Sequence, residues 1–197
     1  VALGGENMLR FGTLLPVPSH PVGPPTTADA YYNHPFGIFW TSAFFVAIFG
    51  HHDWVCRLPA VLISALTVPL LGALGRALWS PFAGAVAATA FVLTPIALAF
   101  STMNSLEVAV IFGTLLASYA YVRFRQTYRR RFAVLAVFAL VYAANSDWAA
   151  FVFAAGLFAL GFARALAPTA QFGRIDLRRS LALLGAGALL VAAVGVA

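Results

Sequence analysis

Long apolar runs separated by short polar breaks dominate this sequence. Two runs, Leu58–Leu78 and Phe82–Phe100, have full length for a membrane span, because a helix needs about 20 residues to cross the hydrocarbon core. The shorter or truncated runs are Val108–Val122, Phe132–Ala144, Trp148–Phe162 and a last one from Leu181 onward. The pattern predicts an all-α fold, a polytopic transmembrane helix bundle.

The first 33 residues break this pattern. Five prolines between Pro16 and Pro25 stand among Gly, Thr, Ser and His, which is typical of a loop with extended backbone. Irregular backbone cannot face lipid, because its polar groups would lack hydrogen bonds. We therefore predict three parts: an extracytoplasmic Pro-rich loop over 1–33, a juxtamembrane helix and link over 34–56, and the transmembrane bundle over 57–197.

The run Pro35–Gly50 has two interpretations. It is rich in Phe and Trp and shorter than the ~20 residues of an ordinary span. Aromatic residues favour the membrane interface, so we expect a juxtamembrane helix on the outer surface that begins near His34. The alternative is a short true span, which would place the Pro-rich loop inside the cell.

Composition strengthens the membrane assignment. The chain is 62% hydrophobic and 9% charged, whereas soluble domains are about 45–50% apolar and 25% charged. All twelve basic residues are arginines, which give a net charge of +6. They stand at the ends of apolar runs, which indicates a role in membrane orientation and not in nucleic-acid binding.

The arginines also predict which side each turn faces. A cytoplasmic cluster at Arg123–Arg131 requires Phe100–Glu107 and Asn145–Asp147 to lie outside. Every arginine then lies inside except Arg10 and Arg57.

Two acidic residues are candidates for a polar cavity on the outer side. Glu107 begins an apolar run within one helical turn of Asn104, and a carboxylate at mid-membrane costs about 2.5–3.5 kcal/mol. Glu107 therefore either faces water or a partner, or lies at a helix N-terminus, where the helix dipole favours it. Asp147 precedes the next run, so its alternative role is a helix N-cap.

The histidines and the single cysteine are less informative. His34 follows a Tyr-Tyr-Asn segment that includes Tyr32, so imidazole and aromatic groups cluster at the interface; a histidine without a role is the alternative. His51-His52-Asp53 is a weak metal signal, because adjacent histidines point in different directions. Cys56 has no partner for an internal disulfide. The sequence holds no phosphate-binding glycine loop, HExxH or GxSxG motif.

The order of motifs resembles the protein O-mannosyltransferase-like family of polytopic membrane glycosyltransferases, which includes aminoarabinose transferases. Residues 7–12 resemble its ARNxLRxG element, 31–35 its YYxHPP element and 49–59 its FGxxEWxxRLP element. Asn104–Glu107 stands where the family carries an Asn/Asp/Glu motif, and 146–148 resemble a TDWP turn. The chain departs from these motifs at Phe36, Thr102 and Ala149. The family's catalytic Asp is expected before Val1, so no catalytic residue is assigned here.

The resemblance implies transfer of a sugar from a polyprenyl-phosphate carrier to an acceptor, with inversion, on the extracytoplasmic side of the plasma membrane. His34 and Tyr32 are then expected on the donor-phosphate side, with Asn104, Glu107 and Asp147 shaping the cavity. The implied partners are the lipid-linked donor, membrane lipid and an acceptor of unknown class. No nucleotide cofactor is expected, and no residue supports a divalent metal. The alternatives are a non-catalytic membrane subunit and a secondary transporter, which would show broken helices and inverted repeats.

Overall fold

The computed structural model describes residues 2–18 and 23–166. These residues form eight α-helices and one 3-10 helix, with no strand among them, so the all-α prediction is confirmed. The predicted span from Leu181 lies outside the described residues. The helices are α1 (Ala2–Phe11), α2 (Gly37–Phe49), α3 (Asp53–Leu78), α4 (Pro81–Leu93), α5 (Pro95–Phe100), α6 (Leu106–Thr127), α7 (Arg130–Ala144) and α8 (Ala149–Leu166).

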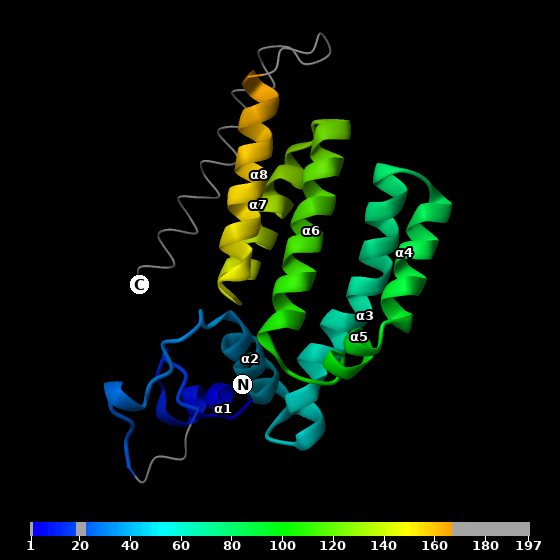
Figure 1. Cartoon of the computed structure of the whole chain (residues 1–197). Coiled ribbons are helices and arrows are strands. Elements are labelled where there is room, and N and C mark those ends of the chain that lie inside the picture. Colours follow the sequence, from blue (N-terminus) through cyan, green and yellow to red (C-terminus); the bar gives the residue numbers. More distant parts are fainter. Residues whose placement is uncertain (1, 19–22, 167–197) are drawn as a thin grey trace.

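The bundle is built around α6, which packs against α3, α7 and α8 (Figure 1). Small residues allow the closest approaches, as is common between membrane helices. A Cβ added to Gly113 of α6 would lie 2.8 Å from the Cβ of Ala143 in α7, and one added to Gly75 of α3 would lie 2.6 Å from the Cα of Gly84 in α4. A larger side chain at either glycine would push the paired helices apart.

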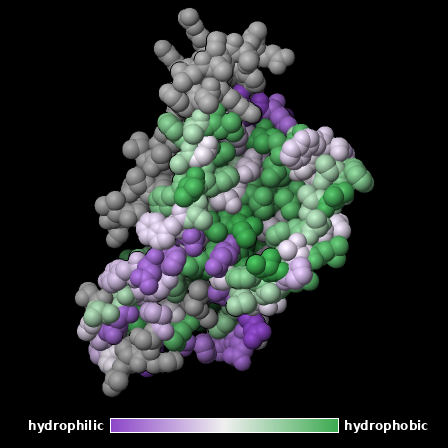
Figure 2. All heavy atoms as spheres, viewed as in Figure 1, coloured by the Kyte–Doolittle hydropathy of each residue, from purple (hydrophilic) through white to green (hydrophobic). Residues whose placement is uncertain are grey.

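Among the described residues, two helices, α3 and α6, are long and apolar enough to cross a membrane. Large apolar side chains such as Phe82, Phe138 and Val152 are more than two-thirds exposed on the bundle. Figure 2 shows a hydrophobic zone between polar side chains at the two ends of the molecule. This distribution fits a helical membrane bundle, because lipid solvates apolar side chains that water would not.

The expected single span Phe82–Phe100 is wrong as one helix. It divides into α4 and α5 at Thr94, which has extended φ and ψ of −72° and 118°. The cause is Pro95, which has no N–H to donate and whose ring disfavours helical geometry at the preceding residue. The break turns α5 out of line with α4 at the end of the bundle where α6 begins (Figure 1).

The first 33 residues are not all loop, because Ala2–Phe11 forms α1 and Thr27–Asp29 a 3-10 helix. Helix α1 packs on α2 through glycine: a Cβ on Gly5 would lie 2.8 Å from the carbonyl oxygen of Phe39. Helix α2 lies at the end of the bundle where α3 and α6 begin (Figure 1). That α2 is a juxtamembrane helix stays a prediction.

The opposite end of the bundle carries the arginines. Arg76 stands in the last turn of α3, and the cluster Arg123–Arg131 occupies the α6–α7 turn. The Gln126 side-chain amide donates to the Ala77 carbonyl at 2.7 Å and joins the two regions. The structure thus brings these arginines to one end, as the alternation of helices requires; their cytoplasmic location stays a prediction.

Candidate functional site

Segments far apart in the sequence meet at the end of the bundle that holds α1 and α2. A buried cluster joins α1, α2 and the start of α6. Its buried members are Met8, Ile38, Phe39 and Ala109, and the side chains packed against it are Tyr31, Leu106 and Tyr142. Apolar burial here holds together the first loop, the Asn104–Glu107 segment and the end of α7, which leads into the link that contains Asp147.

His34 is held by Tyr31. The Tyr31 hydroxyl lies 2.6 Å from His34 Nδ1, and the two rings stack with centroids 5.9 Å apart. The predicted residue Tyr32 is instead mostly exposed. Sequence reasoning missed Tyr31; its spacing of three residues from His34 was the signal that could have identified it.

The first loop is tied to the α7–α8 link by two hydrogen bonds. The Trp148 indole N–H donates to the Asn33 carbonyl at 2.8 Å, and the Gly37 N–H donates to the Asn145 carbonyl. A side chain at Gly37 would contact Asn145, so glycine is needed for this close approach. His34 is therefore positioned from both sides, between Asn33 and the start of α2.

Asp147 begins α8. Its Oδ1 accepts a hydrogen bond from the Ala149 N–H at 2.9 Å, which satisfies one of the unpaired N–H groups at the start of a helix. The helix-cap alternative is thus observed. Because Asp147 is only half-buried, its carboxylate also keeps access to a ligand.

Asn104 contacts α2. Its side-chain amide donates to the Ser42 hydroxyl at 2.6 Å, across 62 positions of sequence. Its Oδ1 and the neighbouring Ser105 hydroxyl are both buried without a hydrogen-bond partner. Unpaired buried polar atoms are costly, by about 1–3 kcal/mol each, so this is a place where a polar ligand would find acceptors.

Glu107 lies at the edge of an apolar cavity. It stands exposed in the first turn of α6 and lines a cavity of about 370 Å³ between α3, α4, α5 and α6. Except for Glu107 and the hydroxyls of Ser64, Thr67 and Thr94, the lining side chains are apolar. A second cavity of about 280 Å³ shares Ser64, Phe91 and Ala97 with the first. Together they form an apolar groove with one carboxylate.

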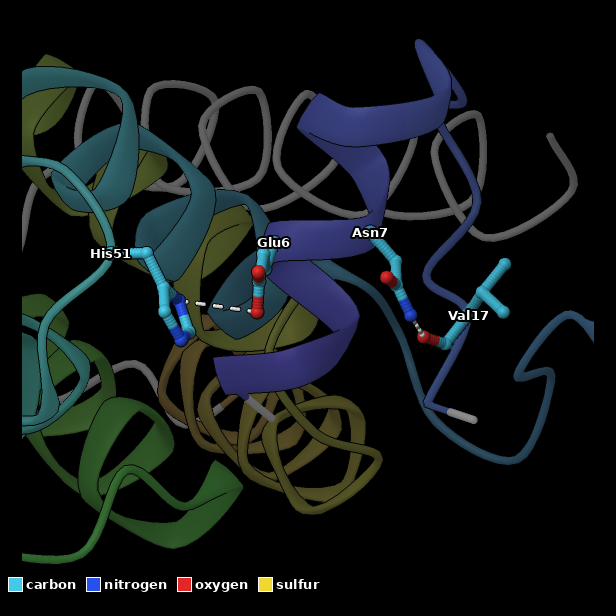
Figure 3. A network of polar contacts seen from close by, with 4 residues as sticks. All are labelled: Glu6, Asn7, Val17 and His51. Carbon is cyan, nitrogen blue, oxygen red and sulfur yellow. Dashed lines mark hydrogen bonds and ion pairs between the residues drawn. The ribbon is translucent and has the colours of Figure 1, made fainter. Parts of the chain in front are cut away.

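The end of α1 contributes a separate polar network (Figure 3). Asn7 is buried and donates to the Val17 carbonyl at 2.7 Å, which fixes the loop after α1. Glu6 forms an ion pair with His51 at 3.1 Å, whereas His52 stacks on Trp54 with centroids 6.3 Å apart. The neighbouring histidines therefore have different partners, as expected for adjacent residues.

The described residues contain no group of three His, Cys, Asp or Glu that could hold a metal ion. Further along the first loop, Asp29 accepts hydrogen bonds from the backbone N–H and the hydroxyl of Thr26. These bonds lower the pKa of its carboxyl and stabilise the turn.

Of the predicted site residues, Asn104 contacts α2 and Glu107 lines the cavity. The structure records no direct contact among His34, Glu107 and Asp147 within the described residues.

Comparison with known proteins gives a consistent result. The family described as dolichyl-phosphate-mannose-protein mannosyltransferase matches residues 33–195. A Bacillus subtilis (strain 168) protein named "Putative mannosyltransferase YycA" is 33% identical over 86 residues, which cover 44% of this chain and 13% of that protein. No solved structure matches the chain significantly. The matched region includes His34, Asn104, Glu107 and Asp147.

Proposed function

The chain belongs to the dolichyl-phosphate-mannose-protein mannosyltransferase family, and from this premise we propose that the protein is a membrane glycosyltransferase. In this proposal it moves a sugar from a polyprenyl-phosphate-linked donor to an acceptor on the extracytoplasmic face of the plasma membrane. The fold supports it, because a helical bundle with an apolar exposed surface suits a membrane enzyme. The aligned relative is matched over only 13% of its length, so the activity rests on the family and on the site.

The observation that carries the proposal is the convergence of distant motifs at one end of the bundle. The His34 loop, the Asn104–Glu107 segment and the Asn145–Asp147 link meet around α2. A lipid-linked sugar needs polar groups for phosphate and sugar beside an apolar surface for the isoprenoid. This end of the molecule offers both.

His34 is proposed to bind the donor phosphate. If the Tyr31 hydroxyl donates to Nδ1, Nε2 carries the hydrogen and can donate to a phosphate oxygen. Tyr31 and the Trp148–Asn33 hydrogen bond hold the imidazole in place. An oriented donor at the leaving phosphate stabilises the charge that develops as the sugar–phosphate bond breaks.

The cavity edged by Glu107 is proposed to take the first part of the isoprenoid chain. Its lining is largely apolar, and the second cavity continues it along the exposed side of α3 and α4. Glu107 is then placed where the apolar chain ends and polar groups begin. Asn104 and Ser105 supply buried acceptors for sugar hydroxyls.

The transfer is a displacement at the anomeric carbon. The acceptor oxygen or nitrogen attacks that carbon, the bond from the carbon to the phosphate oxygen breaks, and configuration inverts. A general base must take the acceptor proton. By the family resemblance that base is an Asp expected before Val1, so none of the described residues is assigned as catalytic.

Kinetics with both substrates varied test the proposal. His34→Ala should raise the apparent KM for the lipid-linked donor by about tenfold, the loss of roughly one charged hydrogen bond, with little change for the acceptor. His34→Lys should keep part of the activity, because a fixed cation can replace the donor hydrogen bond. His51→Ala is the matched control, since His51 lies at the same end of the molecule but pairs with Glu6. If His34→Ala changed the apparent KM only for the acceptor, His34 would belong to acceptor binding and not to donor binding.

A further inference from the structure

The arginines at the far end of the bundle form a group of positive charges that the proposed transfer reaction does not involve. Helix α6 ends at Thr127 and α7 begins at Arg130, with Tyr128 in the left-handed conformation at φ 53° between them. We call five side chains the arginine end. Four of them lie at or beside this turn, Arg123, Arg129, Arg130 and Arg131, and the fifth, Arg76, stands in the last turn of α3.

Two of these arginines converge on one aromatic ring. The guanidinium carbons of Arg123 and Arg131 lie 5.7 Å and 5.0 Å from the centroid of the Phe132 ring. Arg123 donates to the Gln126 side-chain oxygen at 3.2 Å, but its buried Nε has no hydrogen-bond partner. The ring attracts each cation and thereby holds two like charges near each other.

No acidic residue in the described part of the chain lies near them. The five acidic side chains there belong to α1, the first loop and the helix ends at the opposite side of the bundle: Glu6, Asp29, Asp53, Glu107 and Asp147. The first turn of α7 also lacks an acidic residue and instead begins with Arg130 and Arg131. A helix N-terminus attracts anions, so cations there add to a positive potential that no acidic side chain of the described residues offsets nearby.

The surroundings place the arginine end at a membrane interface. Trp79, which follows α3, is 79% exposed, and Tyr128 is also exposed. Exposed Trp and Tyr beside an apolar helix surface are typical of headgroup depth. Polar side chains gather at this end of the bundle next to the hydrophobic zone (Figure 2).

We propose that the arginine end binds the anionic headgroups of phospholipids in the membrane leaflet opposite the candidate transfer site. Phosphate oxygens accept hydrogen bonds from guanidinium groups, and the exposed Arg129, Arg130 and Arg131 can supply them. The bound lipid neutralises the repulsion around Phe132 and strengthens the α6–α7 turn. This inference rests on the membrane location and not on sugar transfer, so either can fail without the other.

Lipid titration by native mass spectrometry of the purified full-length protein tests it. Wild type should bind phosphatidylglycerol more tightly than phosphatidylcholine. The triple variant R129Q/R130Q/R131Q should lose at least about tenfold of its phosphatidylglycerol affinity, since each arginine near an anionic surface contributes about 1 kcal/mol. The triple variant R129K/R130K/R131K should retain most of the phosphatidylglycerol affinity, because charge is the main requirement. Arg57 is an exposed arginine at the other end of the bundle, so the control variant Arg57→Gln should leave that affinity unchanged.

Three results would overturn the proposal. The first is equal binding of phosphatidylglycerol and phosphatidylcholine by wild type. The second is an unchanged phosphatidylglycerol affinity in the Gln triple variant. The third is displacement of bound phosphatidylglycerol by inorganic phosphate as effectively as by the lipid at the same concentration, which would indicate a free-phosphate site. If the Gln triple variant fails to insert into the membrane, the same lipid titration of the wild-type protein at rising salt concentration tests the proposal. The preference for phosphatidylglycerol should shrink as the Debye length falls from about 8 Å to 3 Å between 0.15 and 1 M, and a preference that does not change would contradict an electrostatic headgroup site.

Discussion

Gly37→Ala probes the contact that joins the first loop to the α7–α8 link. The Cβ of alanine would lie 2.6 Å from the Asn145 carbonyl oxygen and 2.9 Å from its carbonyl carbon. Ordinary contact begins near 3.4 Å, so the two segments must separate by about 0.8 Å. The two nearest atoms of Asn145 are backbone and the new Cβ is fixed to the backbone of α2, so no flexible side chain can move aside.

The expected cost follows from this geometry. Overpacking of this kind costs about 1–3 kcal/mol, and the Gly37–Asn145 hydrogen bond, worth about 1 kcal/mol, is stretched at the same time. The gain in helix propensity from Gly to Ala is at most about 1 kcal/mol and is smaller in the first turn. A net destabilisation of about 1–3 kcal/mol remains. Because the shift also moves His34 relative to Trp148, sugar transfer should fall by tenfold or more, as misplacement near 1 Å does elsewhere.

Thermal unfolding in detergent and a sugar-transfer assay on the same preparations measure both effects. Gly156→Ala is the matched control, because a Cβ added at Gly156 in α8 meets nothing within 4 Å. That variant should unfold at or slightly above the wild-type temperature and keep full activity. A Gly37→Ala protein as stable and active as wild type would refute the claim that this contact positions the site.

Three further predictions address the cavity and the topology. Glu107→Gln should lower sugar transfer by more than about tenfold while expression and folding stay normal, because a carboxylate at the end of a membrane helix is costly and usually serves a function. Full turnover in this variant would mean that Glu107 is only a helix-end residue. Pro95→Ala should let α4 continue through Thr94 and reduce the volume of the cavity. The KM for the donor should then rise while the KM for the acceptor does not. A change in the acceptor KM alone would argue against the cavity as the donor site. In a Cys56→Ser background, a cysteine at Ala149 should react with a membrane-impermeant reagent from outside intact cells and one at Arg130 should not; labelling of both from one side would contradict the orientation.

Hydrophobic runs predicted where the long helices lie but not how long each one is. The full-length run Leu58–Leu78 lies within α3 and the shorter run Val108–Val122 within α6, whereas the full-length run Phe82–Phe100 is divided between α4 and α5. Apolar runs become helices because lipid leaves few stable alternatives. The ends of runs also marked the arginine end correctly, since the alternation of helices brings Arg76 and the Arg123–Arg131 turn together. The ordered series of motifs, from residues 7–12 to 146–148, carried the family assignment, which the match over residues 33–195 bears out.

The effect of each proline on its helix could not be predicted from the sequence. Pro59 and Pro69 lie inside α3 without ending it, whereas Pro95 separates α4 from α5. A proline in a membrane helix is tolerated when neighbouring groups satisfy the freed carbonyl, and those neighbours belong to other helices. The sequence therefore could not tell which proline would divide its helix, although that break forms one wall of the cavity.

The sequence by itself determined the helices that cross the bundle, the end that carries the arginines and the segments that contain the polar candidates. Only the tertiary structure decided how those segments meet. The Asn104–Ser42 hydrogen bond spans 62 positions, and the Trp148–Asn33 hydrogen bond spans 115. Helix packing sets both contacts, and the second lies beside the close approach that Gly37 permits to Asn145. Pairing at such separations leaves no local pattern in the chain.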